Sequence, residues 1–381
     1  MSWLSKPKSF LGVDLGAGGV KLVELRQEKN RPVLFTYGLT SAPQDVHRVF
    51  AAVDKTIDEL TDHKTSSQQV AKAAADPGLN DKKIEEYAAL LRLVCKQAKT
   101  VSKSATVSLP ISLVFHALIN LPLLKKEELG PILKAEIKKL LPRPIEEMAL
   151  DYQILPALPE QKTIRVLVNA VPREVVTFYT QVFKRAGLIL DALEPESVAL
   201  ERALVGRDAS VVMLVDIGAE RTNFFIIDQS VAVTHQSVEL GGAKINKILG
   251  RTLGIEDSLV EQLKYDLFNE WSNQPPAQSK ENLLTLLAPI IDPIIKEIEY
   301  SFEMYLRQSG NENKRPEKVI LTGGGANLPF LSEYIAEKFK LKCYLGDPWG
   351  RIVFQDGLKP LLHKIGPRMS VAIGLALRNV V

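Results

Sequence analysis

The sequence has little of the residue types that build metal sites and disulfide frameworks. Only two of its 381 residues are cysteine, Cys95 and Cys343, and they lie too far apart in sequence for a zinc-type pair. The five histidines are scattered without the short spacing that metal-binding histidines show. These absences argue against a disulfide-rich or zinc-stabilised domain, and the scarcity of cysteine favours a reducing compartment.

The sequence also lacks an excess of either charge and any long apolar run. It has 48 lysine and arginine residues against 45 aspartate and glutamate residues, a balance that argues against a nucleic-acid-binding surface. The most apolar helical stretch, residues 283–298, is interrupted by Asp292 and Pro293 and falls short of the roughly 18–20 apolar residues of a membrane span. The first ten residues lack the apolar core of a signal peptide. We therefore expect a cytoplasmic protein that reaches a membrane only through a partner.

What the sequence does contain is an internal duplication. In residues 10–25 and again in residues 211–228, an apolar strand ends in Asp-x-Gly and the chain returns as a second strand. The two motifs begin at Asp14 and Asp216. A carboxylate at the end of a buried strand is costly unless it is paired or binds a cation, and the glycine lets backbone amides approach an anion. One such turn is also typical of an ordinary hairpin, but two at matching positions favour a shared phosphate site.

A third glycine-containing turn follows near the C-terminus. Residues 321–327 read as the end of a strand, the three glycines Gly323, Gly324 and Gly325, and the start of a helix. Such a turn brings backbone close to a flat ligand or to a phosphate at a helix start, although a tight strand–helix connection needs glycine for its own sake. The pattern matches neither the Walker sequence nor Gly-x-Gly-x-x-Gly, so those phosphate-binding folds are disfavoured.

Hydrophobic periodicity outlines the rest of the chain. Residues 41–80 have the composition of an irregular or weakly helical insertion. The remaining pattern predicts alternating strands and helices, which indicates an α/β protein. Predicted strands are residues 31–40, 105–109, 114–121, 150–155, 163–171, 230–238 and 318–321; predicted helices are residues 81–102, 125–141, 172–186, 241–268, 283–308, 329–339 and 369–378.

The three glycine motifs, in this order, resemble the phosphate-1, phosphate-2 and adenosine motifs of the actin-like ATPase superfamily. Within that superfamily the chain is similar to the PilM family of type IV pilus assembly proteins and to the FtsA division proteins. Further matching stretches lie at residues 107–115, 119–122, 128–144, 151–154, 194–196 with Ala199, 240–245 and 372–378.

The resemblance implies an actin-like fold of two duplicated ribonuclease-H-like lobes, with a small subdomain of the FtsA and PilM type inserted in the first lobe. It divides the chain into a first-lobe core at residues 1–110 with the variable insertion 41–80, the small subdomain at 111–170, and the rest of the first lobe with the interlobe connection at 171–208. The second lobe follows at 209–365, with a helical subdomain at about 246–315, and residues 366–381 form a helix that returns to the first lobe.

The resemblance also implies ATP and Mg²⁺ as ligands, with Asp14 and Asp216 holding the metal through water. Relatives carry serine or threonine after the first Asp-x-Gly, whereas Ala17 and the two glycines after it have no hydroxyl, so we expect ATP binding with at most slow hydrolysis. Glu194 and Gly374 match the interlobe connections and are expected at the hinge. The implied ATP-binding residues are Asp14, Gly16, Ala17, Gly18, Gly19 and Lys21 on one side of the phosphates; Asp216, Gly218, Ala219 and Thr222 on the other; Gly323, Gly324, Gly325 and Ala326 at the adenosine; and Gly241, Gly242, Glu261 and Lys264 at the purine and ribose.

Three functions remain open at this point. The resemblance favours an ATP-binding component of the type IV pilus inner-membrane platform that binds the N-terminal cytoplasmic peptide of PilN and links it to the pilus motor ATPase, with self-association left open. An FtsA-like division protein is the alternative, but the sequence after residue 378 shows no membrane-binding amphipathic helix. A small-molecule kinase of the same superfamily would need a base for its acceptor, and neither Asp151 nor Asp191 lies in such a motif.

Overall fold

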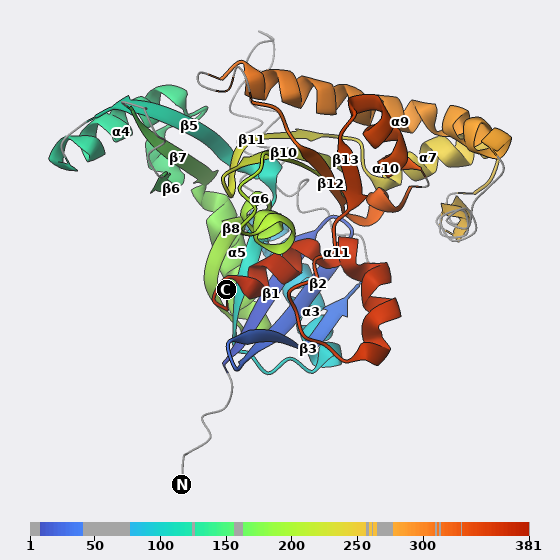
Figure 1. Cartoon of the computed structure of the whole chain (residues 1–381). Coiled ribbons are helices and arrows are strands. Elements are labelled where there is room, and N and C mark those ends of the chain that lie inside the picture. Colours follow the sequence, from blue (N-terminus) through green and yellow to red (C-terminus); the bar gives the residue numbers. More distant parts are fainter. Residues whose placement is uncertain are drawn as a thin grey trace.

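Two five-stranded sheets with the same strand order form the two lobes of the molecule (Figure 1). The computed structural model describes residues 8–40, 77–123, 126–155, 163–256, 259–260, 262–264, 277–308, 311, 314–328 and 330–380. The expected insertion at residues 41–80 therefore falls outside the described residues, except for its last four.

The first-lobe sheet has the order β3-β2-β1-β4-β8, and the second-lobe sheet has the order β11-β10-β9-β12-β13. In each sheet three antiparallel strands are followed by two strands that run parallel to the central one. The duplication predicted from the sequence is thus confirmed strand by strand. The bounds are β1 Ser9–Gly16, β2 Gly19–Glu28, β3 Arg31–Leu39, β4 Ser104–Leu109 and β8 Ile189–Pro195 in the first lobe, and β9 Val212–Ile217, β10 Thr222–Asp228, β11 Val231–Val238, β12 Lys318–Thr322 and β13 Lys342–Leu345 in the second.

Helices bury one face of each sheet. In the first lobe α3 (Pro77–Ala98) and α5 (Arg173–Ala186) share a core with β1, β2 and β4. In the second lobe the core under β9, β10 and β12 is closed by α7 (Gly242–Leu253), α9 (Ala277–Leu306) and α10 (Leu331–Phe339). Each helix presents an apolar stripe to its sheet, which supplies the hydrophobic stabilisation of the lobe.

Helix α11 (Lys359–Leu377) links the second lobe to the sheet of the first lobe. It follows the second lobe in sequence but packs on the first-lobe sheet, where Met369, Ala372 and Ile373 share a core with Val23 and Leu25 of β2. The approach is so close that a Cβ on Gly12 of β1 would lie 2.2 Å from the carbonyl oxygen of Ala372. The first lobe is therefore complete only when α11 is in place.

The interlobe connection runs through α6 (Glu196–Leu200) and a π-helical turn at Glu201–Val205. Both predicted hinge residues lie at this junction. A Cβ on Gly374 would lie 1.8 Å from the carbonyl oxygen of Ala199, so α6 and α11 touch through their backbones. The Glu194 carboxylate accepts a hydrogen bond from Arg202 at 3.0 Å and forms an ion pair with Arg378 at 2.6 Å.

The small subdomain projects from the first lobe (Figure 1). Its antiparallel sheet has the order β5-β7-β6, and one face is covered by α4 through a separate apolar cluster. Its elements are β5 Phe115–Pro122, α4 Lys126–Leu140, β6 Met148–Ile154 and β7 Thr163–Pro172, and short 3₁₀ turns occur at Ile111–Leu113, Ile145–Glu147, Gly324–Asn327 and Asp356–Leu358.

Several element bounds differ from those predicted. Helix α11 begins ten residues earlier than expected. Pro360 lies in its first turn, where proline is tolerated, and Pro367 lies inside the helix. Helix α7 ends at Leu253, and Gly254, with a φ of 67°, takes the left-handed conformation of a helix cap. The predicted helical region at residues 241–268 is therefore interrupted, and residues 259–260 and 262–264 are helical again. Strands β8 and β13 were not predicted.

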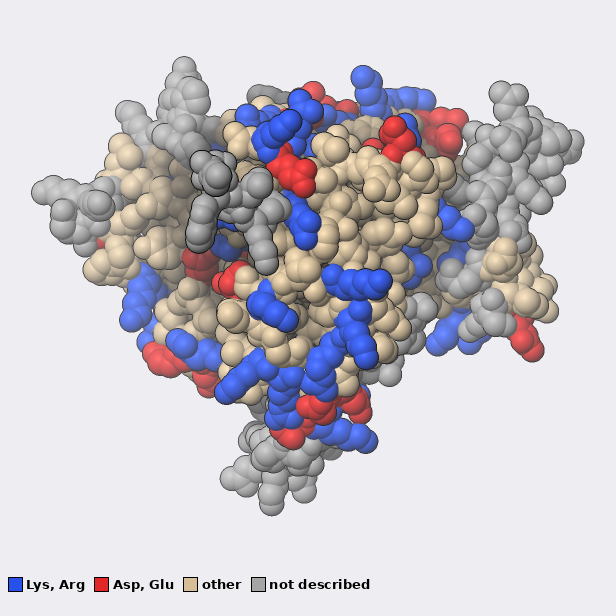
Figure 2. Space-filling view, turned by 90° about the horizontal axis from the view of Figure 1, so that it is seen from below, with Lys and Arg blue, Asp and Glu red and all other residues tan. Residues whose placement is uncertain are grey.

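The surface charge is mixed. Seen from below, lysine and arginine side chains are prominent over the first lobe, and acidic side chains lie among them (Figure 2). No helix in the described part of the chain has both the length and the apolar character needed to cross a bilayer.

Candidate functional site

A cavity of ≈ 510 Å³ lies between the two lobes, where the three glycine turns meet. Both hairpin turns, the turn after β12 and the middle of α11 contribute to its walls. The structure therefore brings together residues that are more than 300 positions apart in sequence. Thirteen of the predicted ligand-binding residues line it: Asp14, Gly16, Ala17, Gly18, Lys21, Asp216, Gly218, Ala219, Gly242, Lys264, Gly323, Gly324 and Gly325.

In the first-lobe turn the carboxylate has its own cation. Asp14 ends β1 and lies opposite Lys21 of β2, whose Nζ is 2.9 Å from Asp14 Oδ2. The Ser108 hydroxyl donates to Asp14 Oδ1 at 3.1 Å. All three side chains are buried, so the ion pair offsets much of the cost of placing a carboxylate there.

In the second-lobe turn the matching carboxylate has no lysine. Asp216 ends β9 and lies opposite Asn223 of β10, which is neutral. Burial, with the nearby charge of Asp14, raises the pKa of Asp216 to about 7. Burial and the charges of Asp14 and Asp216 also raise the pKa of Glu196, at the start of α6, well above its usual range. This half of the cavity therefore favours an added cation.

The carboxylates in the cavity suit a metal ion that keeps its water better than one bound directly by protein side chains. Among the described residues, no three histidine, cysteine, aspartate or glutamate side chains converge closely enough to hold a metal ion. Magnesium keeps much of its water and binds through one or two carboxylates together with phosphates. The carboxylates of Asp14 and Asp216 suit Mg²⁺ held through water, and the metal itself stays a prediction.

The glycines keep the walls of the cavity free of side chains. Gly323 has a φ of 85°, and a Cβ there would lie 2.4 Å from Asp216 Oδ1. A Cβ on Gly18 would lie 3.1 Å from the Cβ of Ala219, so the two hairpin turns nearly touch across the cavity. Within the described part of the chain, the backbone amides of Ala17, Gly18 and Ala219 donate to no protein acceptor. The site therefore presents backbone donors from both lobes to one anion.

Some predicted residues do not line the cavity. Gly19, with a φ of 109°, closes the first hairpin, and the buried Thr222 hydroxyl donates to the carbonyl of Leu240. Gly241 packs against the backbone of Glu220, and Ala326 is buried beneath the third turn. Glu261 lies outside the described residues, so its pairing with Lys264 stays a prediction.

Other lining residues were not assigned from the sequence. Glu196, Asn246 of α7 and Arg368 of α11 each come from a separate element, so no local motif joins them. Asn223 did carry a signal, because it follows Asp216 by seven residues, as Lys21 follows Asp14. Aligning the two repeats would have identified it.

Comparison with known proteins agrees with this architecture. The family described as "Type IV pilus assembly protein PilM" matches residues 76–380. The solved PilM-PilN type IV pilus biogenesis complex is similar over 98% of both chains, with a TM-score of 0.74 and 22% identity. Ethanolamine utilization protein EutJ from Carboxydothermus hydrogenoformans is similar over 98% of this chain and 91% of its own, with a TM-score of 0.50 and 15% identity.

Curated sequences give a more distant match. Cell division protein FtsA of Pseudomonas aeruginosa is 23% identical over 48% of this chain and 47% of its own length, and FtsA of Borreliella burgdorferi is 26% identical over 51% and 49%. The chain thus spans about half the length of these relatives. Because the PilM family matches far more than half of the sequence and the fold agrees, the chain belongs to the PilM family of type IV pilus assembly proteins and has an actin-like fold.

Proposed function

We propose that the interlobe cavity binds ATP with Mg²⁺ and that the chain is the nucleotide-binding component of a type IV pilus assembly platform. The observation that carries this proposal is that both hairpin turns line one cavity and present to it the amides of Gly18 and Ala219, which are unpaired among the described residues. The phosphates would lie in the cavity beside these turns, where backbone donors and glycine give close access. Bound Mg²⁺ would supply a positive charge to balance the carboxylates of Asp216 and Glu196.

The same geometry supports slow turnover at most. Neither Ala17 nor the two glycines after it offers a hydroxyl beside the phosphates, and Ser108 already donates to Asp14. The lining residues position the nucleotide through backbone amides and carboxylates, and none of them is assigned as a general base.

Titration of the full-length chain with Mg-ATP tests the nucleotide site. Asp216→Ala is expected to weaken Mg-ATP binding at least tenfold, corresponding to about 1.4 kcal/mol, while the circular dichroism spectrum stays that of the wild type. Asp208→Ala, which removes a carboxylate of the interlobe connection outside the cavity, is the control and should bind as the wild type does. Unchanged affinity in Asp216→Ala would contradict the proposed site.

We also propose that β6 receives the N-terminal cytoplasmic peptide of a PilN-type membrane protein. Among the described residues β6 pairs with β7 alone, so its outer edge offers unpaired backbone groups. Leu150, Tyr152 and Ile154 alternate along one face of this strand and are 38%, 50% and 50% exposed. An open strand edge with alternating apolar side chains is suited to adding an extended peptide as a further strand.

This interaction would bring the chain to the cytoplasmic face of the inner membrane through its partner and toward the pilus motor. A synthetic N-terminal peptide of the cognate PilN is expected to bind the full chain, and Tyr152→Lys should weaken binding about tenfold or more by placing a charge in an apolar contact. Gln153→Lys, on the opposite face of β6, is the matched control. Equal effects of the two substitutions would remove the assignment of this edge.

A further inference from the structure

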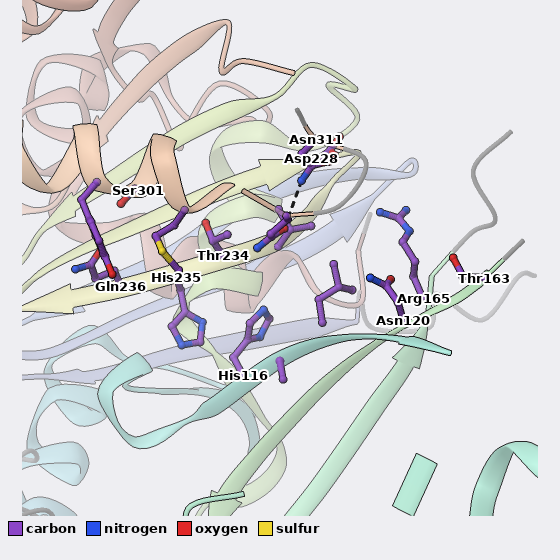
Figure 3. Close-up of a pocket in the computed structure, with 16 residues that line it drawn as sticks. His116, Asn120, Thr163, Arg165, Asp228, Thr234, His235, Gln236, Ser301 and Asn311 are labelled. Carbon is purple, nitrogen blue, oxygen red and sulfur yellow. Dashed lines mark hydrogen bonds between the residues drawn. The ribbon is translucent and has the colours of Figure 1, made fainter. Parts of the chain in front are cut away.

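A second cavity of ≈ 680 Å³ lies between the small subdomain and the second lobe, and it shares no lining residue with the interlobe cavity. One wall is the face of the small sheet that points away from α4, and the other consists of β11, the end of β10 and α9 (Figure 3). The two walls meet where the rings of His116 and His235 lie 4.6 Å apart. Its size falls within the roughly 300–1,000 Å³ of small-molecule sites.

Three buried side-chain atoms on the residues of these walls have no hydrogen-bond partner among the described residues. They are Nε of Arg165, Nδ1 of His235 and Oγ of Ser301. Ser301 is only 5% exposed, so bulk water does not satisfy its hydroxyl. Buried polar atoms in folded proteins are almost always paired, and three such atoms on residues that line one cavity favour a polar occupant.

The charged side chains on the walls indicate whether the occupant is an anion or a cation. Asp228 is already neutralised, because Lys314 Nζ lies 2.8 Å from its carboxylate and the Tyr305 hydroxyl donates to it at 3.0 Å. Burial lowers the pKa of both histidines, to about 3 for His235, so neither carries a charge at neutral pH. Arg165 makes no ion pair with any described residue. Among the described residues on the walls, one positive charge is therefore unmatched.

We propose that this cavity binds a small organic anion, a carboxylate or phosphate ester whose remaining surface carries hydroxyl or amide groups. Arg165 of β7 takes the anionic group, since a guanidinium binds carboxylate and phosphate through charge-assisted hydrogen bonds. Ser301 of α9, the histidine pair and Asn120 of β5 serve the polar body of the ligand (Figure 3). The ligand would contact two parts of the fold at once and hold the small subdomain against the second lobe.

Calorimetry and thermal unfolding of the full chain test this site, with citrate and glucose 6-phosphate as probes and uncharged glucose as the comparison. At least one of the two anions is expected to bind saturably and to raise the Tm, while glucose does neither. Arg165→Gln should weaken that binding about tenfold or more. Lys134→Gln, which removes a positive charge from exposed α4 outside the cavity, should leave it unchanged.

A second variant separates a ligand site from a structural role. Ser301→Ala removes an unpaired buried hydroxyl, so it is expected to leave the Tm without probe the same or higher and yet to weaken the anion severalfold. Two results overturn the proposal. One is that neither anion binds better than glucose, in which case the cavity holds water only. The other is that Arg165→Gln and Lys134→Gln weaken binding equally.

Discussion

The two lobes have the same strand order but different charges at matching positions. Seven residues after its Asp-x-Gly aspartate, the first lobe has Lys21, and the second lobe has Asn223. Each lies directly opposite the aspartate in the hairpin register. The first lobe therefore neutralises its carboxylate with its own side chain, whereas the second depends on a raised pKa or on an added cation. One half of the duplicated fold thus holds a paired carboxylate, and the other half holds a carboxylate that we propose a bound cation neutralises.

The largest difference between the lobes is expected when Lys21 and Asn223 are each replaced by an apolar residue. Lys21→Met is expected to lower the free energy of unfolding by about 3 kcal/mol, because it leaves Asp14 buried without its cation. Asn223→Ala should cost only about 1 kcal/mol, since it removes neutral hydrogen bonds. Urea denaturation of both variants measures the difference. If both variants lose the same free energy of unfolding, the Lys21–Asp14 ion pair stabilises the fold no more than the hydrogen bonds of Asn223 do.

The pH dependence of stability should sharpen the comparison. The pKa of Asp216 is about 7 in the folded chain against an ordinary value of 3.8, so the folded state keeps a proton that the unfolded state loses first. Its contribution to the free energy of unfolding is therefore full below about pH 4 and is lost as the pH rises toward about 7. Glu196 acts in the same direction.

Nucleotide-free unfolding measured across this pH window checks the prediction. Asp216→Asn should flatten the fall in stability, because the amide does not titrate. In the wild type, Mg-ATP binding should strengthen as the pH rises through 7, since the metal competes with the proton on Asp216. A slope that is identical in Asp216→Asn and wild type would exclude Asp216 as the titrating group.

The smallest effect is expected at the first turn. Ala17→Thr supplies a hydroxyl beside the proposed phosphates and should tighten Mg-ATP binding about threefold, as expected for one added hydrogen bond. Ala17→Val has the same shape without the hydroxyl and is its control. If Ala17→Thr and Ala17→Val bind Mg-ATP equally well, a hydroxyl at position 17 does not contribute to the affinity.

Much of the fold could be predicted because its signals are local. The alternation in residues 10–25 and 211–228 and the turn glycines within them specify hairpins without reference to the rest of the chain. Edge strands β8 and β13 were missed because their burial is partial and their apolar pattern is weak. The start of α11 was missed because Pro360 and Pro367 resemble helix breakers when their tertiary setting is unknown.

The candidate site was predictable to the same extent. Glycine and aspartate in a turn form a local motif, so Asp14, Asp216 and Gly323 could be assigned before the structure was known. Glu196 and Arg368 could not, because each is placed by packing between distant elements. The second cavity had no sequence signal at all, since His116, Arg165 and Ser301 come from three elements that only tertiary contacts bring together.

The packing of α11 on the first lobe also has a consequence for biosynthesis. The apolar face of β2, with Val23 and Leu25 fully buried, is covered by residues 369–377, which leave the ribosome more than 300 residues later. Until then this face has no partner, and exposed apolar sheet promotes aggregation during slow, non-local folding. The first lobe is therefore begun early in synthesis and completed only after α11 has been made.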